Sequence, residues 1–259
     1  LATMKDMGMG DMDMSDGALA GMDHSGTAMG GASATPVAEA MPGMAMPDKP
    51  APAADPMAGM DHSAMGGMAG MDHGSMKMRD FSVAPQVRRD PSVQTISPMP
   101  SDRMGEPGQG LENVKHKVLT YHDLVALDRN PDVRAPDRSL DIHLTGNMER
   151  FMWSFDGMKM SDHHEPIPFL EGERVRINLI NDSMMSHPIH LHGHFFELVT
   201  GKGAYSPRKH TVLVQPGGTA SFDFTADALG DWAFHCHMLY HMHAGMMRVV
   251  SVRPRGEAA

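Results

Sequence analysis

The chain has 259 residues and a formal net charge of −10, which argues against a nucleic-acid-binding protein because binding to phosphates requires a basic face. Methionine is unusually frequent, with 29 residues, whereas aromatic residues make up only 5%, so a large hydrophobic core cannot extend over the whole chain. A single cysteine excludes an internal disulfide, and no apolar run approaches the ~20 residues of a membrane-spanning helix.

Residues 1–79 form a low-complexity segment rich in Met, His and Asp, with 17 of the 29 methionines. A loose repeat occurs at Met22–Ser25, Met60–Ser63 and Met71–Gly74. Branched and aromatic residues are almost absent, so the segment cannot bury enough apolar area to offset its ordering entropy, and we predict disorder. Thioethers are soft ligands that select Cu(I). The composition therefore favours a copper-collecting segment over a plain flexible linker.

Residues 80–110 contain five prolines among polar residues and are predicted to be a linker. A globular domain is predicted at 111–253, followed by a short tail at 254–259. Within it, Val118–Leu127 fits either a strand or a short helix, because its periodicity does not decide between them.

Alternating apolar and polar residues, separated by Gly and Pro turns, predict a series of short strands and no long helix. The predicted strands are Ser139–Thr145, Arg174–Leu179, Phe195–Val199, Thr211–Val214, Thr219–Phe224, Trp232–His235 and Met247–Val252. In the first of these, His143 falls on the polar face and is not expected to bind a metal. This pattern is typical of an all-β sandwich.

The stretch from His235 to Met246 holds the only cysteine, Cys236, with histidines directly on both sides. His241 follows five residues after the cysteine and Met246 ten residues after it. One thiolate, imidazoles and a distant thioether form the ligand set of a blue-copper site. A short helical turn at 238–243 would bring His241 back toward the cysteine.

Side chains alternate faces along a strand, so Cys236 should point one way while His235 and His237 point the other. The same parity applies upstream, where His190 and His192 share a face and His187 lies out of step with them. We therefore predict a mononuclear copper site and a second metal site behind it. The predicted members are His187, Cys236, His241 and Met246 at the first site, and His190, His192, His235 and His237 at the second. A buried apolar cysteine, a core methionine or a zinc site would each explain one motif, but none explains both.

Two histidines within the two histidine-rich motifs remain without a predicted role. His194 continues the alternating run after His192, and His243 follows His241 by two residues. Either could lie beside a ligand or at the surface.

Both motifs, His187-Pro-x-His190-x-His192 and His235-Cys236-His237-x3-His241-x4-Met246, resemble the C-terminal copper motifs of multicopper oxidases, in particular the periplasmic copper-resistance oxidases of the CopA and PcoA type. The resemblance is close over about residues 110–253. It implies a Greek-key cupredoxin sandwich and three kinds of copper centre. By resemblance, the type 1 copper takes His187, Cys236, His241 and Met246, the type 2 copper takes His190, and the type 3 pair takes His192, His235 and His237.

The resemblance also implies a cluster of eight histidines, half of them in His-x-His motifs of an N-terminal domain. Outside the two centres no histidine pair in this chain has that spacing, so it supplies four of the eight. It also begins at Leu1 with no initiator and no signal peptide. We therefore expect the C-terminal part of a longer oxidase, with an N-terminal cupredoxin domain as its partner.

The function implied is a periplasmic oxidase in which Cu(I) or another reductant delivers electrons at the type 1 copper. Cys236 would relay them to His235 and His237, and O2 would be reduced to water at the three-copper cluster. Met158 and Met160, beside acidic residues, could bind substrate Cu(I) or simply fill the core. Two alternatives remain: a non-enzymatic copper-sequestration protein and a laccase-like phenol oxidase.

Overall fold

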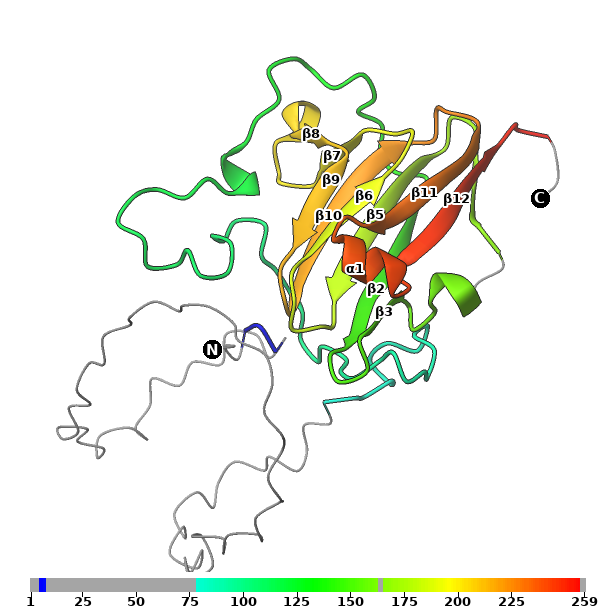
Figure 1. Cartoon of the computed structure of the whole chain (residues 1–259). Coiled ribbons are helices and arrows are strands. Elements are labelled where there is room, and N and C mark those ends of the chain that lie inside the picture. Colours follow the sequence, from blue (N-terminus) through cyan, green and yellow to red (C-terminus); the bar gives the residue numbers. More distant parts are fainter. Residues whose placement is uncertain (1–4, 8–77, 163–164, 257–259) are drawn as a thin grey trace, which may run out of the picture. The chain divides into compact units, whose positions relative to one another are not determined.

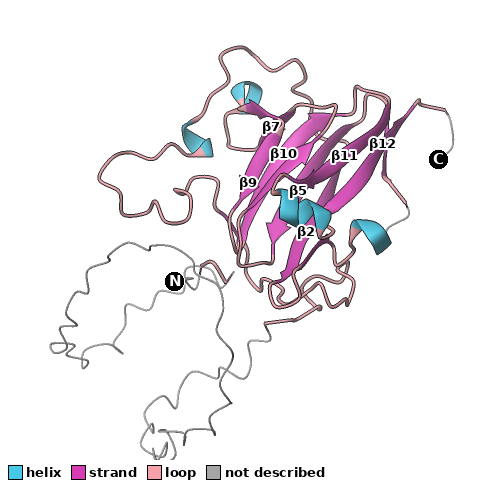
Figure 2. Cartoon of the chain, viewed as in Figure 1, coloured by secondary structure: helices cyan, strands magenta, loops and turns pink. Residues whose placement is uncertain are grey.

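The computed structural model describes residues 5–7, 78–162 and 165–256 (Figure 1). The predicted methionine-rich copper-collecting segment lies almost entirely outside these residues. The described part from residue 78 onward is built mainly of strands joined by loops, with short helical turns (Figure 2). None of its helices is long and apolar enough to cross a membrane.

The first sheet contains seven strands in the order β3-β2-β5-β10-β7-β8, with β1 paired to β10 beside β7. Its members are β1 (Ser101–Asp102), β2 (Arg138–Asn147), β3 (Met152–Phe155), β5 (Arg174–Asn181), β7 (Phe196–Leu198), β8 (Arg208–Lys209) and β10 (Gly218–Thr225). Strand β7 pairs only with Phe222–Phe224 of β10, which leaves Gly218 and Thr219 free to pair with β1. The β2–β5 and β1–β10 pairs are parallel, and the other pairs are antiparallel.

The second sheet contains five strands in the order β4-β12-β11-β6-β9. They are β4 (Ile167–Leu170), β6 (His187–Leu191), β9 (Thr211–Val214), β11 (Gly230–Cys236) and β12 (Met247–Arg253). Strand β11 lies between β12 and β6, with His235 opposite His190 and Cys236 opposite Ile189. The helix α1 (Leu239–His243) follows directly after β11 (Figure 1).

The core lies between the two sheets, because alternate residues of each strand turn inward. On β10 the pattern alternates strictly between buried and half-buried residues, and Phe222 and Phe224 are buried. Rings from both sheets meet in the middle: Phe155 of the first sheet stacks on Phe234 of the second at 5.1 Å between centroids. Burial of such large apolar side chains is the main contribution to the stability of the sandwich.

All seven predicted strands are present, with ends that agree to within two residues. Strands β1, β3, β4, β6 and β8 were not predicted. Within Val118–Leu127 the structure contains only a 3-10 turn, Tyr121–Asp123. The helical turn predicted at 238–243 is confirmed as α1.

Residues 80–110, predicted to be a linker, pack against the sandwich over much of their length. Val87, Val93 and Ile96 form a small buried cluster. Backbone bonds attach the segment to the β2–β3 hairpin, with Arg88 donating to Asp156 at 2.8 Å and Gln94 donating to Gly146 at 3.0 Å. The prolines that suggested a linker restrict local conformation but do not prevent this long-range packing.

His143 differs from its prediction as a polar-face residue, because it is 4% exposed. Its Nδ1 lies 2.7 Å from a carboxylate oxygen of Asp182, whose other oxygen accepts the backbone N–H of Ser97 at 2.9 Å. The segment before β1 thus closes over this side of β2. Burial alone would lower the pKa of His143, but the hydrogen bond to Asp182 and the negative charges of Asp182, Asp156 and Asp141 together outweigh it, and the pKa is raised.

Candidate copper centres

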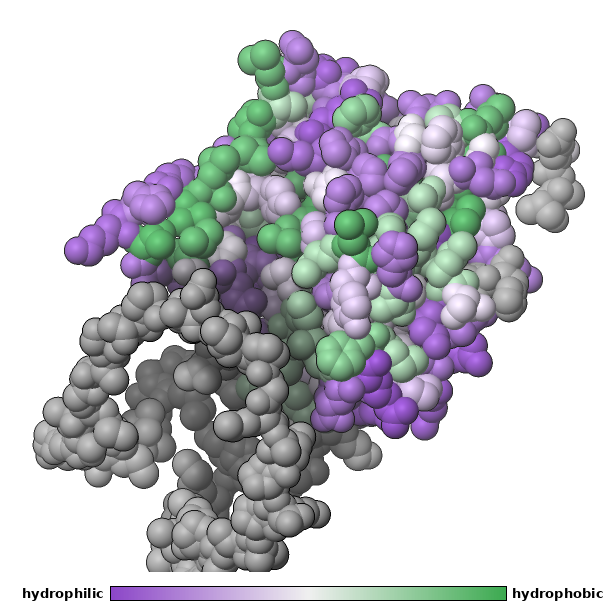
Figure 3. Space-filling view, in the orientation of Figure 1, coloured by the Kyte–Doolittle hydropathy of each residue, from purple (hydrophilic) through white to green (hydrophobic). Residues whose placement is uncertain are grey.

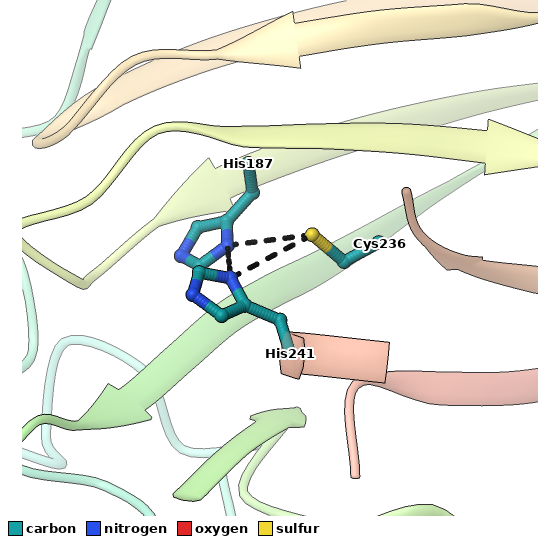
Figure 4. Close-up of side chains that lie close together, drawn as sticks. All are labelled: His187, Cys236 and His241. Carbon is teal, nitrogen blue, oxygen red and sulfur yellow. Dashed lines mark hydrogen bonds between the residues drawn. The ribbon is translucent and has the colours of Figure 1, made fainter. Parts of the chain in front are cut away.

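Three potential metal ligands, His187, Cys236 and His241, converge from three elements: the first residue of β6, the last residue of β11 and the middle of α1 (Figure 4). The Sγ atom lies 3.7 Å from Nδ1 of His187 and 3.8 Å from Nδ1 of His241. The two Nδ1 atoms are 3.1 Å apart. We call these three residues the buried triad. One metal ion could contact all three atoms after a small adjustment.

Burial keeps both imidazoles of the triad neutral. Cys236 and His187 have no exposed surface, and His241 is 2% exposed. Burial lowers the pKa of His187 to about 3, assisted by the neighbouring His241, and it lowers the pKa of His241 to about 4. Burial also raises the pKa of the Cys236 thiol to about 11. The metal-free triad is therefore uncharged near neutral pH, and a bound cation would favour the thiolate.

Packing around α1 holds His241 in place. The ring of Trp153 on β3 stacks on the imidazole at 4.2 Å with an interplanar angle of 14°. Gly245, directly after α1, has a φ of +128°, and a Cβ there would lie 2.8 Å from the carbonyl oxygen of Trp153. Only glycine allows the chain after α1 to pass this close to β3.

Met246, predicted as the axial ligand, is fully buried. Its backbone is hydrogen-bonded to two residues of the triad. Its N–H donates to the carbonyl of His241 at 2.9 Å, and its carbonyl accepts the N–H of Cys236 at 3.1 Å. These bonds fix its backbone between two triad residues, and its role as a ligand stays a prediction.

A second group of histidines lies on the other face of β11. Possible ligand atoms of His190, His192 and His235 are within 4.8 Å of one another, and Nε2 of His192 is 3.1 Å from Nε2 of His235. The ring of His237 stacks against His235 at 5.7 Å and lies 5.6 Å from that of His190. We call these four residues the open histidine group, because His192 and His237 are exposed.

Backbone carbonyls orient two rings of this group. Nδ1 of His190 lies 2.6 Å from the carbonyl oxygen of His210, and Nδ1 of His235 lies 2.9 Å from that of Cys236. An imidazole that donates its Nδ1–H to a carbonyl presents the lone pair of Nε2 to a metal. Burial lowers the pKa of both His190 and His235. Both rings are thus suited to bind a cation through Nε2.

Three further histidines lie close in sequence or in space to the two groups. His194 packs against Phe224 and Trp232, and its Nδ1 lies 3.1 Å from the carbonyl of His192. His243 is exposed on α1 and belongs to neither group. His210, which the sequence did not single out, contacts His190, and the Nδ1 atoms of the two rings are 3.3 Å apart. Its position just before β9, which pairs with β6, was the available signal.

A family model described as multicopper oxidase matches residues 134–256, which include both groups. This match identifies residues 134–256 as a multicopper oxidase domain, and the predicted cupredoxin sandwich and copper cofactors are confirmed. Copper resistance protein A of Escherichia coli is 46% identical over 259 residues, covering 97% of this chain and 40% of that protein. A copper resistance protein A homolog of Pseudomonas syringae pv. tomato is 51% identical over 64% of this chain and 28% of its own length.

A more distant relative, multicopper oxidase MmcO of Mycobacterium tuberculosis, is 38% identical over 43% of this chain and 22% of its own length. The chain thus spans less than half the length of each of these relatives. The residues present fit copper: the triad offers one soft sulfur and two neutral imidazoles, and the open histidine group offers imidazoles only.

Proposed function

We propose that this chain is the C-terminal part of a copper-resistance oxidase, with a type 1 site at the buried triad plus Met246. The open histidine group would form its half of a three-copper cluster, with His190 at the type 2 copper and His192, His235 and His237 at the type 3 pair. The observation that carries the proposal is the placement of the two groups on opposite faces of β11. Copper bound there would supply the one-electron chemistry that couples oxidation of a reductant to reduction of O2 to water.

The chain itself would contribute to this reaction in two ways: it links the two groups covalently, and it excludes water from the buried triad. Cys236 is covalently joined to His235 and to His237, so the two faces of β11 are linked by a route one residue long. Burial excludes water from the triad and strengthens every electrostatic interaction within it. The open group, by contrast, leaves room for further ligands and for a small substrate.

The remaining histidines of the cluster would come from another part of the whole protein. Leu119, Val125 and Leu127, between β1 and β2, are 68%, 60% and 95% exposed. Ala126 donates to the carbonyl of Tyr205 at 2.9 Å, which ties this stretch to the chain just before His210. Figure 3 shows apolar side chains gathered over this side of the molecule. Such a surface suits docking of the domain that completes the cluster.

Cu(I) is the proposed reductant because a copper resistance protein A matches nearly the whole chain. The periplasm is the proposed location because the copper-resistance oxidases that the two motifs resemble are periplasmic. Met158, Asp156 and Asp162 line a cavity of about 480 Å³ beside β4. A thioether with carboxylates would suit a soft cation. The methionine-rich segment at residues 1–79 would collect Cu(I) for this reaction. A phenol would be the competing substrate of a laccase-like enzyme.

The proposal is tested by copper loading of the whole chain and of a variant that lacks residues 8–77. This boundary keeps Met78, whose carbonyl accepts the N–H of Ile96 at 2.8 Å. We expect about one tightly bound Cu(II) with an intense blue band in the shortened chain, and more bound Cu(I) in the whole chain. Absence of a blue band from both would refute the type 1 site, and equal Cu(I) binding would refute the collecting role. Rates of O2 uptake with Cu(I) and with a phenol, after addition of the missing domain, would separate the two substrates.

A further inference from the structure

The loop between β5 and β6 makes a hydrogen bond to the buried triad that the sequence did not suggest. Oγ of Ser183 lies 2.6 Å from Nε2 of His187, and both side chains are buried. This nitrogen is on the far side of the ring from Nδ1, which faces Cys236 and His241. Ser183 therefore contacts the triad only through His187.

The direction of this hydrogen bond follows from the neighbours of Ser183. The amide nitrogen of Asn181 donates to the carbonyls of Met185 at 2.7 Å and Val214 at 3.1 Å, which identifies its other side-chain atom as the oxygen. That oxygen accepts both the backbone N–H and the hydroxyl of Ser183, each at 2.9 Å. The hydroxyl proton of Ser183 is thus used, and its oxygen is left as an acceptor for His187.

A serine that accepts at this position selects one tautomer of the imidazole. With the proton on Nε2 donated to Ser183, the lone pair of Nδ1 points toward the Sγ atom of Cys236. The other tautomer would place a proton on Nδ1 within the triad, and would leave Nε2 and the oxygen of Ser183 facing each other without a proton.

The loop that carries Ser183 is itself held from both sides. Asn181 has no exposed surface, and its bond to Val214 joins the loop to β9. Asp182 is bonded to His143 on β2 and to Ser97 in the segment before β1. The position of Ser183 is therefore fixed by the rest of the domain, so its hydroxyl can determine the orientation of the His187 ring.

We propose that Asn181 and Ser183 are positioning residues that fix the tautomer and the ring orientation of His187 for metal binding through Nδ1. This inference rests on the proposed copper site at the triad. Groups that only hydrogen-bond a metal-bound histidine commonly change metal affinity by about 10- to 100-fold when they are removed. Ser183→Ala should weaken binding of Cu(II) by about that factor and alter the blue absorption band and the reduction potential.

The experiment begins with the metal-free, ¹⁵N-histidine-labelled whole chain near neutral pH, where NMR identifies the protonated nitrogen of each ring. We expect the Nε2–H form at His187, and the Nδ1–H form would overturn the proposal whether or not any variant folds. Copper affinity, blue band and reduction potential are then compared for wild type, Ser183→Ala, Ser183→Thr and Ser186→Ala. Ser183→Thr keeps the hydroxyl and should stay close to wild type, and Ser186→Ala is the matched control beside His187.

The outcomes separate this inference from the proposed function. No blue band in the wild type would refute the copper site and leave the NMR result intact. A wild-type band with unchanged affinity, absorption and potential in Ser183→Ala would refute the positioning role alone. Lower thermal stability of Ser183→Ala with unaltered copper spectra would show that the bond only stabilises the loop. If Ser183→Ala does not fold, the tautomer of the wild type decides the proposal.

Discussion

The two groups of candidate ligands share strands β6 and β11 but differ in how complete they are. The buried triad closes within this chain: three elements meet, both imidazoles are neutral, and Trp153 and Ser183 support the rings from outside. The open histidine group has one buried member, His235, one half-buried and two exposed, and its supports are mainly backbone carbonyls. The comparison indicates that the fold of this domain alone prepares the first site, whereas the second stays open toward solvent in the described residues, as the proposed docking of a further domain requires. The predictions below test that difference.

The largest effect is expected from Cys236→Ser. The thiolate is the origin of the blue absorption, so the band should vanish completely from the copper-loaded chain. The arrangement of the open histidine group should not change, because the substituted side chain lies on the other face of β11. Visible and EPR spectra of the loaded chain provide the measurement. A surviving blue band would contradict the assignment of the triad.

The converse effect is expected from His237→Ala, which removes one member of the open group. The blue band should be unchanged, while O2 consumption by the complete protein should fall by at least about 100-fold, since even groups that only hydrogen-bond a ligand cost 10- to 100-fold. His243→Ala, two residues beyond His241 and outside both groups, is the matched control and should retain activity. Full activity of His237→Ala would remove this residue from the cluster.

A smaller effect is expected from pH on the metal-free chain. Burial lowers the pKa of His187 to about 3 and of His241 to about 4, both below the unfolded value of 6.5. The unfolded state therefore binds more protons as the pH falls from about 6.5 to 4, and the free energy of unfolding should decrease by up to about 1.4 kcal/mol per pH unit for each of these histidines.

Denaturant unfolding at a series of pH values measures this slope. His241→Gln removes one of the two groups and should reduce the slope without reversing it. A free energy of unfolding that stays constant through this range would contradict the burial argument for the triad.

Local patterns were enough to predict seven of the strands and the division of the candidate ligands between two faces. Alternation along β11 separated Cys236 from His235 and His237, and the same rule separated His187 from His190. Such predictions succeed because side-chain direction in a strand depends only on neighbouring residues.

Features that depend on distant segments were not predicted. Polar alternation placed His143 toward solvent, but the proline-containing segment before β1 covers it. Ser183 lies in a short loop that could have been only a turn, and Trp153 is separated from His241 by most of the domain. Their roles arise from contacts between elements, which periodicity does not contain.

Complete burial of Cys236 also determines how durable the metal-free protein is. A thiol with no exposed surface and a pKa of about 11 is protonated near neutral pH, and it is hidden from oxidants and alkylating agents. A chain that waits for its metal in an oxidising environment would therefore keep its one sulfhydryl in the reduced form. Assembly of the centre can follow synthesis after a long delay, without a reductant to restore the ligand.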